Sequence, residues 1–247
     1  MATSHDVVFT RSIDRGFGNS QSHTVNLPSA YKNIYSLQLL SAEVPMSFYA
    51  IPTSYASGVT FTNGSTIAAF SINPGNYTIS ELQPLLLAWL QATYARNGVT
   101  AVNFDSISGK LSVHFTTGSL SVNNTTIGKL GVVLGTSTSA TASVSQVLTF
   151  PNVANVYPIT SIFINVTNLV SNVFSTGGFN AMFRIQCNVQ PGGILFVNNG
   201  TNVYNTVNFA TPLSNLSQLA VQIVDQNNTA LNMNGVEWQW SLGISYA

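Results

Sequence analysis

One stretch of the sequence, residues 70–94, has the apolar spacing of an amphipathic helix, while nearly all the rest alternates between short strands and turns. Its apolar side chains recur at steps of three and four residues, at Ile79, Leu82, Leu86, Trp89, Leu90 and Tyr94. Thr78 or Ser80 can cap the first turn, where Glu81 suits the helix dipole, and Asn97 or Gly98 can provide the left-handed cap that ends the helix. The sequence therefore predicts one amphipathic helix that covers a sheet in a β-rich chain.

The remaining chain contains about ten short runs of strand-like residues with turn residues between them. The clearest runs are residues 22–27, 35–44, 100–104, 110–116, 159–166, 182–189, 203–209, 218–224 and 236–245. A change of apolar phase at Leu39 and Leu40 predicts either a β-bulge or burial on both faces, and the last two runs are expected to form a terminal hairpin. This pattern favours an antiparallel sandwich or jelly roll over a parallel α/β sheet.

The domain organisation expected from these runs is an arm followed by one domain. Residues 1–21 combine charged residues and glycines with few apolar positions, which describes an arm that orders against a partner. Residues 22–247 then form the single β domain, and the length leaves room for a substantial core.

Charged residues make up only 6% of the 247-residue chain, and seven basic side chains balance seven acidic ones. An average soluble protein carries roughly a quarter charged residues. Two interpretations remain open: a surface made polar by Asn, Ser and Thr, or a subunit whose surface is covered by neighbours. The seven Lys and Arg residues are scattered, which argues against nucleic acid as a partner.

The sequence also indicates the cellular compartment in which the protein is made. Cys187 is the one cysteine, so no internal disulfide can form, which is typical of a protein made in the cytosol or nucleus. We find no signal peptide at the start and no apolar run long enough to span a membrane.

No motif for catalysis, a metal ion or a cofactor is present, so we expect no enzyme activity and no cofactor. The three histidines are too dispersed to suggest a metal site. Glu43 and Glu237 are the two carboxylates embedded in expected strands, so a glycosidase that uses them as its acid–base pair is kept as an alternative.

Three passages together resemble the single jelly-roll minor capsid proteins, or pentons, of icosahedral double-stranded DNA viruses of the virophage, polinton-like and large eukaryotic DNA virus lineage. The first joins HTVNLP at residues 23–28 to LQLLSAEVPMSFY at residues 37–49. The second is INPGNYT at residues 72–78 with the helix, the following hairpin and KLGVVLG at residues 129–135. The third is LAVQI at residues 219–223, Asp225 and NGVEWQW at residues 234–240. Residues 168–216 have no counterpart in this pattern.

The resemblance implies an all-β, single jelly-roll sandwich of antiparallel strands, with the helix inserted after an early strand. It further implies a homopentamer at the capsid vertices, in contact with double jelly-roll major capsid proteins and other minor capsid proteins. The location would be the virion, assembled in the host cytoplasm or nucleus. The alternative to a structural capsid protein is a lectin or fibre-head module that recognises sugars or a receptor.

Two groups of residues are predicted to make contacts between subunits. Arg11, Arg15 and Phe17 would anchor the arm to the inner shell. The loop with Met46, Phe48 and Tyr49 either folds back onto its own core or contacts a neighbouring subunit, where aromatic residues and Met are enriched.

Overall fold

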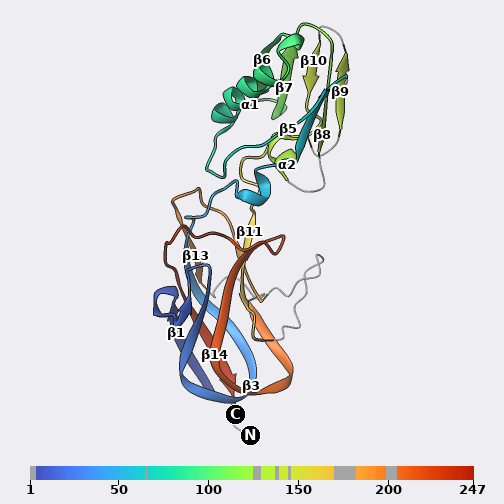
Figure 1. The fold of residues 1–247 in the computed structure, drawn as a ribbon. Coiled ribbons are helices and arrows are strands. Elements are labelled where there is room, and N and C mark those ends of the chain that lie inside the picture. Colours follow the sequence, from blue (N-terminus) through green and yellow to red (C-terminus); the bar gives the residue numbers. More distant parts are fainter. Residues whose placement is uncertain are drawn as a thin grey trace. The chain divides into compact units, whose positions relative to one another are not determined.

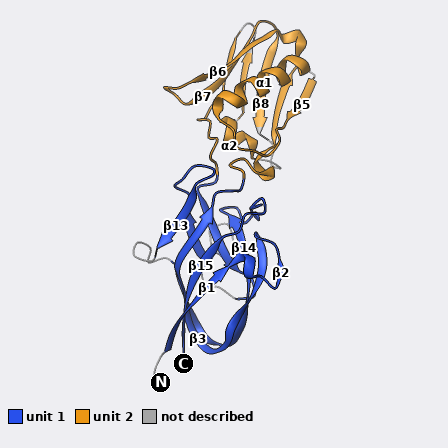
Figure 2. Ribbon diagram, turned by 90° about the vertical axis from the view of Figure 1, so that its left-hand side faces the viewer, with its two compact units in different colours: residues 1–48, 159–247 blue, residues 49–158 orange. Residues whose placement is uncertain are grey.

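The computed structural model describes residues 4–64, 66–124, 129–136, 139–143, 146–169, 182–198 and 205–247. The chain divides into two compact units, coloured separately in Figure 2: unit 1 holds residues 1–48 and 159–247, and unit 2 holds residues 49–158. Antiparallel strands dominate both units, so the prediction of an all-β protein is confirmed.

The elements of unit 1 are β1 (Ser4–Arg11), η1 (Ser12–Asp14), β2 (Phe17–Gly18), β3 (Ser22–Pro45), β11 (Ser161–Val166), β12 (Phe183–Gln186), β13 (Ile194–Asn198), β14 (Thr206–Asp225) and β15 (Gln239–Tyr246). Their strands form one sheet in the order β1-β15-β3-β14-β11-β12, and β13 and β2 also pair with β3.

This sheet folds into a sandwich because β3 and β14 are long enough to belong to both layers. The first part of β3 pairs with the end of β14, which continues to β11 and β12. The second part of β3 pairs with β15 and β13. Between the two parts, Asn33 has a positive φ of 49°, and the pairing of β14 with β3 shifts register between Asn208 and Leu213. These two irregularities bend both strands. Figure 1 shows β3 and β14 curving together.

Two local predictions for β3 have different outcomes. The bulge is confirmed, because Leu242 pairs with Leu39 while Ser241 pairs with Ser41, which leaves Leu40 as the extra residue. The two runs at residues 22–27 and 35–44, however, are one continuous strand through Pro28. Pro28 is tolerated there because the ladder to β14 is interrupted between Asn26 and Tyr31, so its missing N–H removes no regular ladder bond.

The predicted terminal hairpin is wrong, since β3 lies between β14 and β15 in the sheet. Both edges of β14 are already occupied, by β3 and β11, so β15 cannot pair with it. The alternation within β15 is nevertheless as expected, with Trp240, Leu242 and Ile244 fully buried.

The elements of unit 2 are η2 (Thr53–Tyr55), β4 (Val59–Asn63), β5 (Thr66–Phe70), α1 (Ile79–Thr93), η3 (Ala95–Asn97), β6 (Val99–Asp105), β7 (Lys110–Phe115), β8 (Ser119–Asn124), α2 (Leu130–Leu134), β9 (Ala140–Ser143) and β10 (Val147–Thr149). They form two small sheets, β5-β4-β8-β9 and β10-β7-β6.

The helix α1 has the predicted cap and the predicted buried face. Thr78 and Glu81 form a reciprocal capping box at its start, and Gly98, with a φ of 55°, lies in the left-handed region after the short η3 turn. Leu82, Leu86 and Leu90 are buried. Gln83 and Gln91 donate to the backbone carbonyls of Val102 and Val99, both in β6. These bonds fix the helix on that sheet.

The domain organisation differs from the expected arm plus one domain. Residues 4–11 of the expected arm are strand β1, paired along its whole length with β15. The helix and the hairpin of β6 and β7 belong to unit 2, whose described strands pair only with one another. The jelly roll therefore carries a second unit, inserted between β3 and β11, with its own core of residues such as Phe61 and Phe150.

Candidate functional site

The outer face of the layer that contains β1, β15, β3 and β13 carries large apolar side chains exposed to solvent. In register across the strands, Arg11, Gln239, Glu43 and Phe196 form one row, and Phe9, Ser241, Ser41 and Asn198 form the next. The alternate side chains point inward and are buried, as Val8, Trp240, Leu242, Val44 and Leu195 show.

This face, which we call the β1–β13 face, is defined by Val7, Phe9, Glu43, Ile194 and Phe196. Phe9 is 58% exposed and Phe196 is 68% exposed, and they lie in adjacent rows, on strands at the two sides of the face. Single exposed apolar residues are ordinary, but several on one sheet face indicate an interaction surface. β1 is also the last strand of its sheet, so its outer edge pairs with no strand in the described part of the chain.

Two ion pairs hold the residues that follow β1. Arg11 makes a bidentate contact with Asp14, with both N–O distances 2.7 Å. Hydrogen bonding to Arg11 lowers the pKa of Asp14. Arg15 Nη1 lies 2.7 Å from Glu237 Oε1, and Ser12 Oγ also donates to Glu237. Both predicted anchor cations are thus engaged within their own chain.

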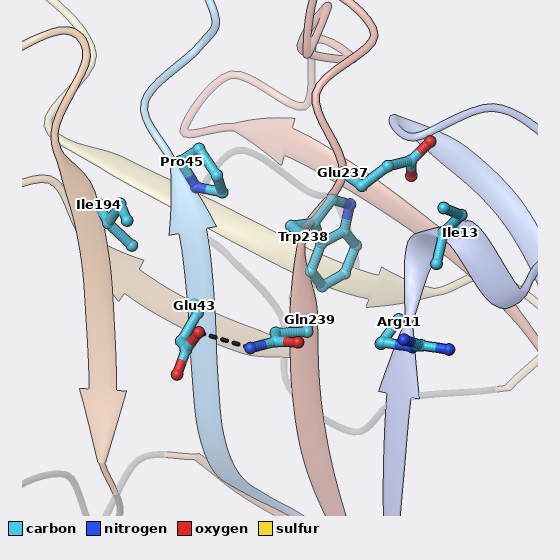
Figure 3. Close-up of a pocket in the computed structure, with 8 residues that line it drawn as sticks. All are labelled: Arg11, Ile13, Glu43, Pro45, Ile194, Glu237, Trp238 and Gln239. Carbon is cyan, nitrogen blue, oxygen red and sulfur yellow. Dashed lines mark hydrogen bonds between the residues drawn. The ribbon is translucent and has the colours of Figure 1, made fainter.

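A shallow pocket of about 190 Å³ lies at one end of the β1–β13 face. Figure 3 shows its lining residues, which are Arg11, Ile13, Glu43, Pro45, Ile194, Glu237, Trp238 and Gln239. Glu43 accepts a hydrogen bond of 2.5 Å from Gln239 Nε2. The structure therefore brings Glu43 and Glu237, the two carboxylates of the glycosidase alternative, to the same pocket.

Glu237 does not have the electrostatics of the general acid that the glycosidase alternative needs. A general acid needs a raised pKa so that it is protonated at neutral pH. Partial burial alone would raise the pKa of Glu237, but hydrogen bonds from Ser12 and Arg15 outweigh that effect and lower it. Glu237 is thus held as a carboxylate by a cation. No group of His, Cys, Asp and Glu within the described ranges could hold a metal ion.

The predicted contact residues separate into buried and exposed ones. Met46 and Phe48 are buried in the core of their own chain, which is the arrangement expected if the loop folds back. Their loop is tied back by Ser47, whose hydroxyl donates to the Met233 carbonyl at 2.7 Å. Tyr49 remains 39% exposed and Phe17 is 81% exposed, so these two can still reach a partner.

Sequence reasoning missed Val7, Phe9, Ile194 and Phe196. The alternation in residues 5–11 was the available signal, with Val7, Phe9 and Arg11 on one side and Val8 and Thr10 on the other. Residues 168–216 include β13 and the first half of β14; positions 170–181 and 199–204 of that range lie outside the described residues. No helix among the described residues is both long enough and apolar enough to cross a membrane.

Comparison with known proteins identifies the fold. No family model matches the sequence, and no curated protein matches it. Among solved structures, the chain is similar to the crystal structure of the SeMet-labelled mavirus penton protein, with a TM-score of 0.55 and 11% sequence identity. The alignment covers 99% of this chain and 100% of that chain. The chain thus has the jelly-roll fold of a penton protein, which confirms the fold implied by the resemblance.

Proposed function

We propose that this chain is a structural subunit of an icosahedral virus capsid, placed at the vertices as a penton. The observation that carries the proposal is the fold likeness to the mavirus penton protein, which spans both chains from end to end and so includes the inserted unit. Fold alone does not determine function, so the proposal also draws on the surface of the sandwich.

The β1–β13 face supports an assembly role. A monomer would leave Phe9, Phe196, Val7 and Ile194 in water, whereas a neighbour that covers them would remove that apolar area from solvent. In the row that contains Phe196, Glu43 accepts a hydrogen bond from Gln239 and Arg11 is paired with Asp14, whereas the row that contains Phe9 carries no charged side chain. Depletion of charge and enrichment of aromatic residues are features of interface cores.

In this proposal the subunit forms a homopentamer, in which each copy contacts the next by two different surfaces that close into a ring. The vertex capsomer then contacts double jelly-roll major capsid proteins and other minor capsid proteins, and its location is the virion. Phe17 and Tyr49 are further contact residues, whereas Arg11 and Arg15 act indirectly by holding the loop that presents Phe17.

The test is the mass of the purified full-length protein at increasing concentration, by native mass spectrometry or mass photometry. We expect five-membered rings for the natural chain. The double variant Phe9→Ser with Phe196→Ser should remain a folded monomer, because it removes the two largest exposed side chains of the β1–β13 face.

The matched control is Ile107→Ser, which removes a side chain that is 96% exposed but lies on unit 2, at the tip of the hairpin of β6 and β7. It should leave ring formation unchanged. A natural chain that stays monomeric at every concentration, also when coexpressed with a major capsid protein, would contradict the proposed function. Deletion of residues 1–20 is not a clean test, because it would remove β1 and uncover β15.

A further inference from the structure

A histidine lies buried beneath the loop of residues 12–21. His23 is 3% exposed, and Gly18 of the loop pairs with it directly. The approach is so close that a Cβ atom on Gly18 would lie 2.8 Å from the His23 Cα. On another side, the His23 and Trp238 rings meet edge to face with centroids 5.6 Å apart. The loop and Trp238 thus shield the imidazole from water.

The hydrogen bonds of His23 fix which nitrogen carries the proton. Nδ1 lies 3.2 Å from the Asn19 carbonyl oxygen, and a carbonyl can only accept, so Nδ1 is the donor. Nε2 then carries the lone pair, and within the described chain it is buried without a hydrogen-bond partner. A second proton on Nε2 would create a buried cation whose new N–H has no acceptor.

Two charged side chains face the ring, Arg15 from the loop and Glu237 from the segment before β15. They form an ion pair with each other at 2.7 Å, so their effects on the imidazole oppose one another. Burial is the largest influence and lowers the pKa of His23, and the hydrogen bond to Asn19 only partly offsets it. The closed loop therefore holds neutral histidine.

The loop is attached by contacts that converge on the same place. Ser12 N donates to the Trp238 carbonyl at 2.9 Å, and Trp238 Nε1 donates to the Ser20 carbonyl at 2.6 Å. Asn19 N donates to the Ser22 carbonyl at 2.8 Å. Opening the loop breaks these bonds and exposes His23 to water at the same time.

We propose that His23 makes the attachment of this loop sensitive to pH, so that acid detaches residues 12–21 from the sandwich by protonating Nε2. The open loop leaves a solvated imidazole, which titrates near 6.5, about the ordinary value. Below that pH the imidazole is protonated in the open form and still neutral in the closed form, so opening becomes more favourable as pH falls. The open fraction should rise up to about tenfold per pH unit until the closed form also protonates. This inference does not depend on the proposed capsid role.

The test is hydrogen exchange of the full-length protein between pH 7.5 and 5.0, with rates corrected for the intrinsic pH dependence of exchange. Protection of peptides from residues 12–21 should fall severalfold or more on acidification, while peptides from β11 keep theirs. In His23→Phe, which keeps a ring, and His23→Gln, which keeps a donor for Asn19, protection of the loop should no longer depend on pH. His114→Gln, in unit 2, is the control and should behave as the natural chain.

Protection of residues 12–21 that is unchanged down to pH 5.0 in the natural chain would overturn the proposal. The same acid-induced loss in both His23 variants would also overturn it. Protection of β11 in each variant reports whether unit 1 has folded, so a folding defect in one variant leaves the other as the test.

Discussion

Trp238 and Trp240, two buried tryptophans two positions apart, should lose very different amounts of stability when each is replaced by Phe. Trp238 and Trp240 are 3% and 1% exposed, and their ring centroids are 6.1 Å apart. Trp238 Nε1 donates to the Ser20 carbonyl at 2.6 Å, whereas Trp240 Nε1 is buried without a hydrogen-bond partner among the described residues. The perturbation is Trp→Phe at each position in turn.

The two variants remove the same atoms, so the lost packing, about 1–2 kcal/mol in each, largely cancels in the comparison. Trp238→Phe leaves the Ser20 carbonyl buried without its donor, which costs about 1–3 kcal/mol. Trp240→Phe removes a polar N–H that is buried unpaired, which returns a similar amount. Because the two effects have opposite signs, the free energies of unfolding should differ by about 3 kcal/mol, with Trp238→Phe the less stable variant.

The assay is urea unfolding followed by tryptophan fluorescence in a Trp89→Phe background. The chain has three tryptophans, and Trp89 belongs to unit 2, so each double variant keeps one fluorophore that reports on unit 1. This matters because two units need not unfold in one transition. Equal stabilities within about 0.5 kcal/mol, or a greater loss in Trp240→Phe, would refute the reasoning on hydrogen-bond satisfaction.

Four further outcomes are expected. Thr78→Ala removes the capping box of α1 and should cost unit 2 about 1 kcal/mol, read from the urea transition of Trp89 fluorescence. Gly18→Ala, with φ at 98° and a Cβ that would clash with the Ser22 carbonyl oxygen, should destabilise unit 1 by several kcal/mol. Gly192→Ala, with φ at 86° and open space around the new Cβ, should cost only about 1 kcal/mol. Burial raises the pKa of the Cys187 thiol from its ordinary value of 9.0 to about 11. Because only the thiolate reacts, Cys187 at pH 8 should react with a disulfide reagent roughly 100-fold more slowly than a free thiol, and its rate should still rise above pH 10. A fragment of residues 49–158 should fold and reproduce the Trp89 transition of the full chain, and loss of that transition would show that unit 2 needs unit 1.

The local structure could be predicted where neighbouring residues decide it. The N-cap of α1, the left-handed cap after it and the hairpin of β6 and β7 depend on residues close to one another in the sequence, and the bulge at Leu40, although it lies opposite β15, is signalled by a local change of apolar phase. Each therefore leaves its own sequence signal. The buried alternation of Trp240, Leu242 and Ile244 belongs to the same class.

The pairings that assemble the sheet could not be predicted in this way. β1 pairs with β15, more than 220 positions away, and the two halves of β3 pair with different partners. Nothing near residues 4–11 signals such a partner, which is why these residues were interpreted as an arm. The inserted unit was missed for a related reason: strands of units 1 and 2 have the same spacing and turn residues, and only their pairing separates them.

The positions of the few charges explain how a low charge content leads to a surface that neighbours can cover. Four of the charged side chains of unit 1 are used in two ion pairs: Arg11 with Asp14 inside the segment 11–15, and Arg15 with Glu237, which ties that segment to the residues before β15. On the β1–β13 face this leaves Glu43, which accepts a hydrogen bond from Gln239 and lies opposite Phe196. Covering this face therefore requires little desolvation of charge, and charge desolvation is what usually opposes the burial of a protein surface. The same arrangement means that association through this face should depend only weakly on salt, because it rests on apolar area rather than on ion pairs.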